Sequence, residues 1–136
     1  KQLDSPENLI IFRGKLAFAI LNRYPYTSGH LMVVPFQHSS VLSELTDDTM
    51  LEMMQLTQKA VSVLGQEYQP QGFNIGMNLG AVAGAGITEH LHMHVVPRWQ
   101  GDANFVSVIG QTRVLPETLE ETYHRMCEAW KRASRA

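Results

Sequence analysis

The chain has 136 residues, a formal net charge of −2 and an apolar share of 44%, values that suit one folded domain spanning 1–136. So small a net charge gives no broad basic face, so we expect no nucleic-acid partner, and no run approaches the roughly 18 apolar residues of a membrane helix. The single cysteine, Cys127, allows no internal disulfide and favours a reducing, cytoplasmic setting.

Three strands are predicted in the first third of the chain. The apolar runs 8–12 and 15–21 are separated by Arg13-Gly14, which is typical of a tight hairpin. A third strand is predicted at 30–35, where Pro35 ends it because proline cannot donate to a ladder.

A helix is predicted next, from an N-cap at Thr46 to a stop at Gly65. Its methionines follow helical spacing, and such a stripe is usually part of a core, so we assign them no function. Two further strands, 72–79 and 89–97, flank the glycine-rich connection 80–86.

The last elements are a short strand at 104–109 and a C-terminal helix at about 116–132, opened by Pro116. Strands outnumber helices and mostly follow one another in sequence. The pattern therefore predicts an α+β domain with an antiparallel sheet and a core within about 8–110.

Three histidines alternate along the predicted strand 89–97. His90, His92 and His94 fall on every second residue, so on a strand their rings lie on one side and the apolar residues between them on the other. One histidine on a strand is commonly structural, but three in strict alternation beside a glycine-rich connection indicate a site.

Clustered imidazoles serve either a metal centre or a nucleophilic site in which one ring attacks and its neighbours hold charge. Three successive same-face residues form a line about 13 Å long, with ~6.6 Å between alternate residues, and a line converges poorly on one ion. The same line suits a chain of phosphates, with backbone amides of 80–86 nearby. We therefore favour the nucleophilic site and predict no bound metal, with a metal-binding protein as the alternative.

These residues resemble the histidine triad (HIT) superfamily, whose signature is His-x-His-x-His followed by two apolar residues. The stretch 90–96 matches that signature fully, and the resemblance covers about 16–105. It also includes Asn22, the run 28–35, His38 and Asn78. The resemblance implies a HIT-like fold, with an antiparallel sheet of about five strands, one long helix and a C-terminal helix.

The resemblance further implies that His92 attacks the α-phosphate of a nucleotide, forming a nucleotidyl-histidine that water or another acceptor then releases. His94 would contact phosphate oxygens, while His90 and His30 would orient or support the reacting groups. The implied nucleotide contacts are Asn22 for the ribose, Asn78 for phosphate, Phe18 and Leu21 for the base, and Gly86, Ile87, Thr88, Arg98 and Trp99. For His38 a surface or supporting role and a role in the site are equally compatible with the pattern, so His38 is left out of the predicted catalytic set.

Two features refine this comparison. Ile87 stands where common members often carry a phosphate-binding hydroxyl, so Thr88, or backbone amides of Gly86 and Ile87, would serve instead. The segment 95–105 looks like a prokaryotic branch associated with diadenosine tetraphosphate phosphorylase or hydrolase activity, in which Arg98 and Trp99 would touch the second nucleotide or its phosphates. Trp99 fits equally well as a packing residue under the last helix.

The leading hypothesis is therefore cleavage of a dinucleoside polyphosphate at the α-phosphate, with diadenosine tetraphosphate as the expected substrate and water or phosphate as acceptor. Two alternatives stay open: a phosphoramidase that releases an amine from a nucleotide, and a nucleotide-binding module with little turnover. We expect no tightly bound cofactor, with Mg²⁺ accompanying the polyphosphate, and the resemblance implies a homodimer.

Overall fold

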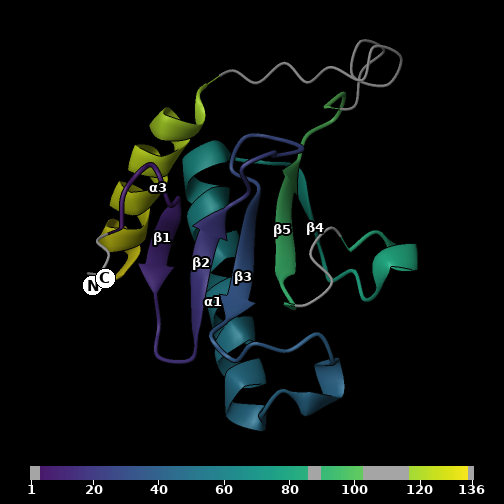
Figure 1. The fold of residues 1–136 in the computed structure, drawn as a ribbon. Coiled ribbons are helices and arrows are strands. Elements are labelled where there is room, and N and C mark those ends of the chain that lie inside the picture. The colour runs from purple at the N-terminus through teal and green to yellow at the C-terminus, as the bar shows by residue number, and fades with distance from the viewer. Residues whose placement is uncertain (1–3, 86–89, 103–116, 135–136) are drawn as a thin grey trace.

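In the computed structural model the described residues are 4–85, 90–102 and 117–134. They form a five-stranded sheet in the order β1-β2-β3-β5-β4, in which every neighbouring pair is antiparallel (Figure 1). The strands are β1 (Ile10–Arg13), β2 (Ala17–Leu21), β3 (Leu31–Pro35), β4 (Gly72–Gly76) and β5 (Met93–Arg98). The helices are α1 (Asp47–Tyr68), α3 (Leu119–Ser134) and the short 3-10 turns η1 (Leu42–Glu44) and η2 (Ala81–Ala83). The predicted α+β class is confirmed.

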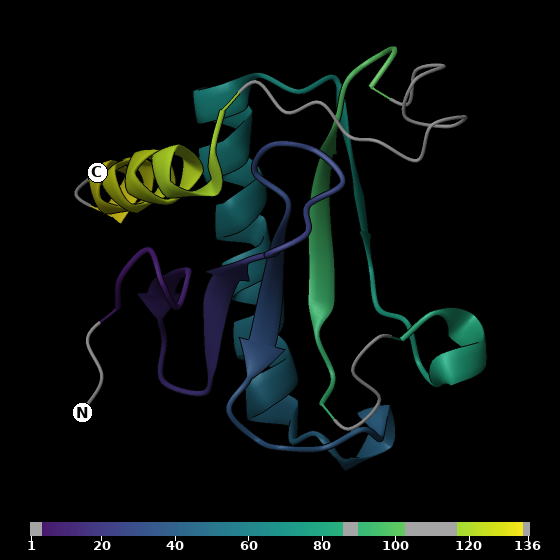
Figure 2. The same ribbon diagram turned by 45° about the horizontal axis from the view of Figure 1, so that its top comes forward.

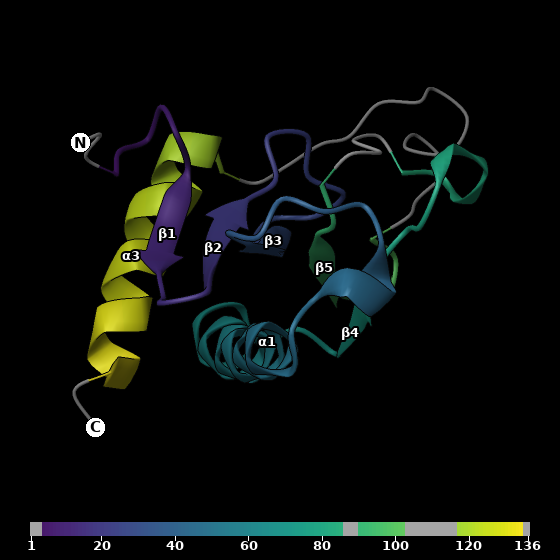
Figure 3. The same ribbon diagram turned by 60° about the horizontal axis from the view of Figure 1, so that its bottom comes forward.

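The two long helices take different places around the sheet. Seen nearly end-on, α1 lies across one face of the sheet and α3 lies at the β1 end (Figure 3). Figure 2 shows η2 standing away from the sheet beyond the end of β4. Within the described ranges, no helix covers the face opposite α1. None of the helices in these ranges is long and apolar enough to cross a membrane.

The core lies between the sheet, α1 and α3. Alternate residues of the central strands point into it because side chains on a strand face opposite sides in turn. Its sheet members include Ala17, Ala19, Leu21, Leu31, Val33 and Val95, and its helical members include Met53, Ala60, Leu64, Tyr123, Met126 and Trp130. The predicted assignment of α1 methionines to the core holds for Met53, which is 2% exposed, whereas Met50 and Met54 are exposed.

The predicted hairpin between β1 and β2 is confirmed, and α1 holds it in place. The Glu52 carboxylate accepts hydrogen bonds from the backbone N–H groups of Leu16 (2.6 Å) and Ala17 (2.8 Å). A Cβ on Gly14 would lie 2.5 Å from the same carboxylate oxygen. Glycine at this turn therefore permits the close approach of the helix side chain.

Helix α1 begins as predicted and ends later. The Thr46 hydroxyl accepts from the N–H of Thr49 (3.1 Å), which makes it the expected N-cap. The predicted stop at Gly65 is wrong, because the helix continues to Tyr68 and Gln69 closes it in the left-handed conformation. Pro70 follows and cannot continue the helix, so it sets the end that Gly65 was expected to set.

Strand β5 begins at Met93, so the prediction that all three histidines lie on one strand is wrong for His90 and His92, which precede it. Its neighbour β3 ends at Pro35, which has no N–H to donate. The N–H of Leu91 bonds instead to the carbonyl of Ser39 (2.8 Å), and the chain leaves the ladder there. β4 also ends earlier than predicted, at Gly76 rather than at residue 79, and Gly76 pairs with His94.

Helix α3 is capped by Thr118 and Glu121. The Thr118 hydroxyl accepts from the N–H of Glu121 (3.1 Å), and the Glu121 carboxylate accepts from the N–H of Thr118 (2.7 Å), which is a capping box. Arg125 then bonds to Glu67 at the end of α1 (2.7 Å). The predicted strand 104–109 and Pro116 lie outside the described residues.

Candidate active site

Three histidine rings from two parts of the chain are in contact, and a fourth histidine, His90, adjoins them through its backbone carbonyl. His30 precedes β3, His94 lies on β5, and their ring centroids are 5.1 Å apart. The His92 ring meets His94 edge to face at 4.9 Å. His90 donates from Nε2 to the carbonyl of Pro35 (2.8 Å), which ties the segment before β5 to the end of β3. The rings of His30, His94 and His92 are therefore brought together, whereas the His90 ring lies at the Pro35 end of β3, the end opposite His30.

The His92 ring is held by its own segment. Its Nδ1 lies 3.0 Å from the carbonyl oxygen of His90. A carbonyl can only accept, so Nδ1 carries the proton and, in the neutral ring, Nε2 carries the lone pair. The same bond remains if Nε2 gains a substituent, and the carbonyl then stabilises the resulting positive ring. This is the arrangement that a nitrogen nucleophile needs.

The proton positions on His30 and His94 also follow from their partners. The backbone N–H of Tyr26 donates to His30 Nδ1 (3.1 Å), so this nitrogen holds a lone pair and the neutral ring carries its proton on Nε2. His30 Nε2 then donates to His94 Nδ1 (2.9 Å). His94 consequently carries its own proton on Nε2, as a neutral donor beside the His92 ring.

Asn22 lies beside this pair. Its Oδ1 accepts from the N–H of Tyr24 (2.8 Å), which turns its amide nitrogen towards His30 Nε2 at 3.3 Å. Both of these nitrogens carry hydrogen in the assignment above, so the 3.3 Å approach is a contact, and the shorter His30 to His94 bond decides the tautomer. The remaining Asn22 hydrogens stay available to a ligand oxygen.

His94 is kept neutral by its surroundings. Burial lowers the pKa of His94 below its ordinary value, and charge on His92 lowers that pKa further. Both causes act in the same direction as the hydrogen bond from His30. His94 therefore suits hydrogen-bond donation to an oxygen on the substrate, with no charge of its own at neutral pH.

The histidine face of the sheet carries an apolar platform next to the rings. Phe18 lies on β2 and its ring is 5.0 Å from that of Phe36. Ile20 pairs with Met32, which pairs with His94, so these three share a face. Leu21, predicted to line the base pocket, is 2% exposed and lies in the core on the opposite face, because neighbouring strand residues alternate.

The connection that carries His30 is tied to the core. The Thr27 hydroxyl donates to the carbonyl of Pro97 (2.7 Å). Gly29 has φ +89, and a Cβ there would lie 2.8 Å from Leu64 Cδ2. Only glycine adopts this conformation readily, and only its missing side chain leaves room for α1. His30 is 0% exposed as a result of this close packing.

The other predicted contacts are more distant or lie outside the described part. Arg98 lies four residues beyond His94, about 13 Å along β5. Its guanidinium bonds to both oxygens of Asp102 (2.6 and 2.9 Å), whose carboxylate also caps the N–H of Trp99 (3.1 Å). Asn78 is exposed in the segment after β4. Gly86, Ile87 and Thr88 are outside the described residues.

Several residues near the rings were not predicted as site residues. Ile20 and Met32 could have been found by extending the alternation from Phe18 and Asn22. Tyr26, whose ring stacks on His30 at 5.1 Å, has no comparable sequence signal. His38, which is not in the predicted catalytic set, has its ring 4.8 Å from that of His90.

The polar groups of the site described above are imidazoles, backbone groups and the Asn22 amide. No group of three or more histidine, cysteine, aspartate or glutamate side chains within the described ranges is placed to hold a metal ion. The geometry supplies a lone pair on His92, a donor on His94 and an apolar platform beside them. Together these can bind a group with an apolar ring and an electrophilic, oxygen-rich centre.

Comparison with known proteins gives a consistent result. A family model described as HIT domain matches residues 3–101. An AP-4-A phosphorylase of Mycobacterium tuberculosis is 50% identical over 131 residues, covering 96% of this chain and 67% of that protein. A bis(5'-nucleosyl)-tetraphosphatase [asymmetrical] of Schizosaccharomyces pombe is 29% identical, covering 68% of this chain and 50% of that protein. The solved structure of a hypothetical histidine triad nucleotide-binding protein from Sulfolobus tokodaii superposes with a TM-score of 0.77 and 26% identity, covering 94% of this chain and 87% of that one.

Proposed function

The chain belongs to the HIT domain family, and from that premise we propose that it cleaves diadenosine tetraphosphate by transferring a nucleotidyl group to His92 and then to inorganic phosphate. The observation that carries the mechanism is the His92 ring, whose Nδ1–H donates to the His90 carbonyl and whose Nε2 is left with the lone pair. The similarity to an AP-4-A phosphorylase supports the substrate and the acceptor.

In the first step His92 Nε2 attacks the α-phosphorus of one adenosine, and the bond from that phosphorus to the bridging oxygen breaks. ATP leaves, and AMP remains joined to His92 through a phosphorus–nitrogen bond. The ring now carries a positive charge, which the His90 carbonyl stabilises through Nδ1–H. The neutral Nε2–H of His94 donates to a phosphate oxygen as charge builds there.

In the second step an oxygen of inorganic phosphate attacks the same phosphorus. The phosphorus–nitrogen bond breaks, ADP leaves, and His92 recovers its lone pair. If water attacks instead, the product is AMP and the enzyme is a hydrolase. The two reactions differ only in the acceptor, so the residues around His92 serve both.

The apolar platform provides a place for the base. Phe18 and Ile20 on β2 are separated from β5 by one strand, so their side chains stand about 10 Å from those on β5. That spacing is comparable with the reach of a nucleotide from its phosphate to its base. Asn22 follows β2, with its amide nitrogen 3.3 Å from His30 Nε2, and it offers amide hydrogens for the ribose.

The experiment that tests this proposal is mass spectrometry of the protein after brief incubation with diadenosine tetraphosphate, with and without phosphate. The wild type should gain the mass of an AMP group on His92, and His92→Asn should not. ADP formed only when phosphate is present identifies a phosphorylase, and AMP formed without it identifies a hydrolase. Undiminished turnover by His92→Asn contradicts the mechanism.

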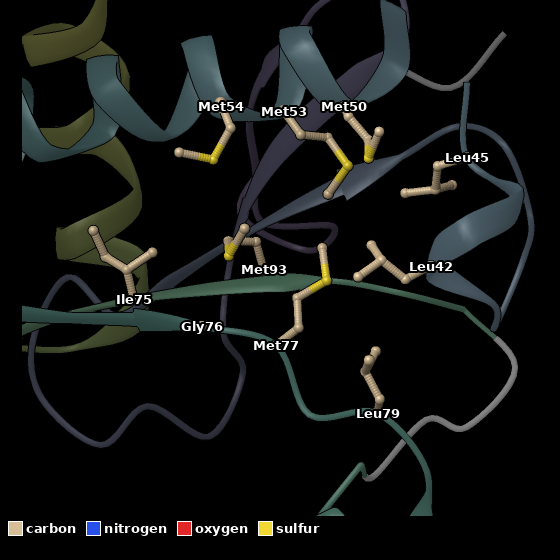
Figure 4. A pocket seen from close by; sticks show the side chains of 10 residues that line it. All are labelled: Leu42, Leu45, Met50, Met53, Met54, Ile75, Gly76, Met77, Leu79 and Met93. Carbon is tan, nitrogen blue, oxygen red and sulfur yellow. The ribbon is translucent and has the colours of Figure 1, made fainter. Parts of the chain in front are cut away.

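We also propose that two copies of the chain pair along β4. This strand is last in the sheet order, and Ile75 on it is 47% exposed. Beside it, a groove of about 460 Å³ opens between α1 and the sheet (Figure 4). Its lining side chains are apolar: Leu42, Leu45, Met50, Met53, Met54, Ile75, Met77, Leu79 and Met93. An open strand edge next to an apolar groove is a surface that a second copy can cover symmetrically.

Light scattering coupled to gel filtration tests this pairing. We expect the mass of a dimer for the wild type and of a monomer for Ile75→Arg, which places charge in the groove. Val82→Arg is the matched control, because Val82 is fully exposed in η2 and does not line the groove. A wild-type chain that remains monomeric at micromolar concentration contradicts the proposal.

A further inference from the structure

We propose that Tyr26 is a positioning residue of this site: through its backbone N–H and its ring it holds His30 in one tautomer, and His30 in turn fixes His94 as the neutral Nε2–H donor. The catalytic part of this role rests on the function proposed above. Its structural part concerns proton positions in the free protein and can be tested separately.

The first step is the bond from the Tyr26 N–H to His30 Nδ1 (3.1 Å). A backbone N–H can only donate, so it excludes a proton from Nδ1. If His30 took the other tautomer, two N–H groups would face each other at Nδ1, and His94 Nδ1 would lose its donor. The bond from this backbone group favours one tautomer of each ring, and it does so as long as water does not compete for His30 Nδ1.

The second step is the ring of Tyr26. It lies nearly parallel to the His30 ring, with centroids 5.1 Å apart and planes 11° apart. Tyr26 is itself 55% exposed, whereas His30 beneath it is 0% exposed. The tyrosine ring thus separates His30 from solvent on that side, so water cannot compete for the bonds at Nδ1 and Nε2.

The third step is the effect on His94. In the described residues, the titratable rings that adjoin His94 are His30 and His92, and Tyr26 covers His30. Burial is the first cause that lowers the pKa of His94. Removing the Tyr26 ring admits water to His30 and its bond with His94, so the pKa of His94 rises towards its ordinary value.

The test compares Tyr26→Ala and Tyr26→Leu with the wild type by two-bond proton–nitrogen NMR of the histidine rings. In the wild type we expect His30 and His94 as Nε2–H tautomers and His92 as the Nδ1–H tautomer. Both variants should show mixed tautomers at His30 and His94 and a higher titration midpoint for His94. His92 serves as an internal control, because its Nδ1 bonds to the His90 carbonyl instead.

In the same variants, kcat on diadenosine tetraphosphate should fall roughly tenfold or more with KM little changed, because a misoriented donor weakens transition-state stabilisation. The acid limb of the kcat profile should move to higher pH, because His94 must be neutral. Tyr26→Phe keeps the stacked ring and should restore wild-type behaviour. Tyr24→Ala, in the same connection but 83% exposed, should leave the tautomers and kcat unchanged.

Unchanged tautomers and an unchanged His94 titration in both Tyr26→Ala and Tyr26→Leu overturn the inference, whatever their activity. A wild type that shows no turnover and no AMP adduct instead overturns the proposed function. The NMR comparison still decides the role of Tyr26 in that case, so the two failures are distinguishable.

Discussion

The two faces of the central sheet are built from alternate residues of the same strands, yet they are held by different forces. On the α1 face, Ala19 and Val33 are 0% exposed and pack against helix side chains. On the other face, the chain of bonds through Tyr26, His30 and His94 orders the side chains. Packing tolerates little change of volume, whereas the histidine chain tolerates little change of proton position. Substitutions on the α1 face should therefore lower the free energy of unfolding, whereas substitutions on the other face should lower activity.

The largest expected contrast is between His92→Asn and Met126→Ala. His92→Asn should lower kcat by at least about 10⁴-fold, because the attacking nitrogen is lost, with only a small change in the free energy of unfolding. Met126 is 0% exposed in α3, and its truncation should cost about 2–5 kcal/mol of stability and leave turnover by the folded protein intact. Steady-state kinetics and urea unfolding of both variants test this contrast. A variant that loses both activity and stability to a comparable extent contradicts the assignment of separate roles to the two faces.

The comparison becomes sharper at two adjacent residues of β2. Leu21→Ala should lower the free energy of unfolding by about 2–4 kcal/mol and leave KM unchanged, because Leu21 lies in the core. Ile20→Ala should cost less stability and raise KM about fivefold, as about 1 kcal/mol of apolar contact with the base is lost. A wild-type KM in Ile20→Ala contradicts the proposal that the apolar platform binds the base.

The hydrogen bonds of Glu52, on the α1 side of the sheet, should contribute to stability and not to activity. Glu52→Ala leaves the N–H groups of Leu16 and Ala17 without their acceptor, so we expect a loss of about 2 kcal/mol in unfolding free energy. The measurement is urea unfolding, with Glu52→Gln as the control because its amide oxygen still accepts. Equal losses in the two variants would mean that the hydrogen bonds are not the cause.

The smallest effect concerns His94 and pH. Because its pKa is lowered in the folded chain, the unfolded chain binds more protons at mildly acid pH, so stability falls as pH drops through about 6.5 towards the folded pKa. NMR titration should give a midpoint for His94 below the ordinary value for a histidine. A midpoint at or above the ordinary value contradicts this prediction.

Much of this division can be predicted from local sequence. Alternation along 90–95 separates buried Leu91 and Val95 from the histidines, and the capping pattern at Thr46 marks the start of α1. The prediction that Leu21 lines the base pocket is wrong, because successive residues of a strand face opposite sides of the sheet. Phe18 and Asn22 already place Ile20, the alternate residue between them, on the site face. That signal was present in the sequence.

Other features depend on contacts between distant segments. The start of β5 at Met93 is set by the missing N–H of Pro35 on its neighbour, which alternation within 89–97 cannot reveal. The extension of α1 to Tyr68 brings Tyr68 to Glu117 of another segment, to which its hydroxyl donates. The stacking of Tyr26 on His30 likewise requires the folded connection. Position on a sheet face could be predicted, whereas the partners of each side chain could not.

The connection between β2 and β3 is joined to β5 through Thr27 and is packed against α1 at Gly29. A loop fixed at both points cannot open locally without disturbing the central sheet. The hydrogen-bonded amide protons of Tyr26 and His30 should therefore exchange with deuterium only as fast as the whole molecule unfolds. By the measure of exchange, these two positions of an irregular loop should belong with the most protected part of the protein.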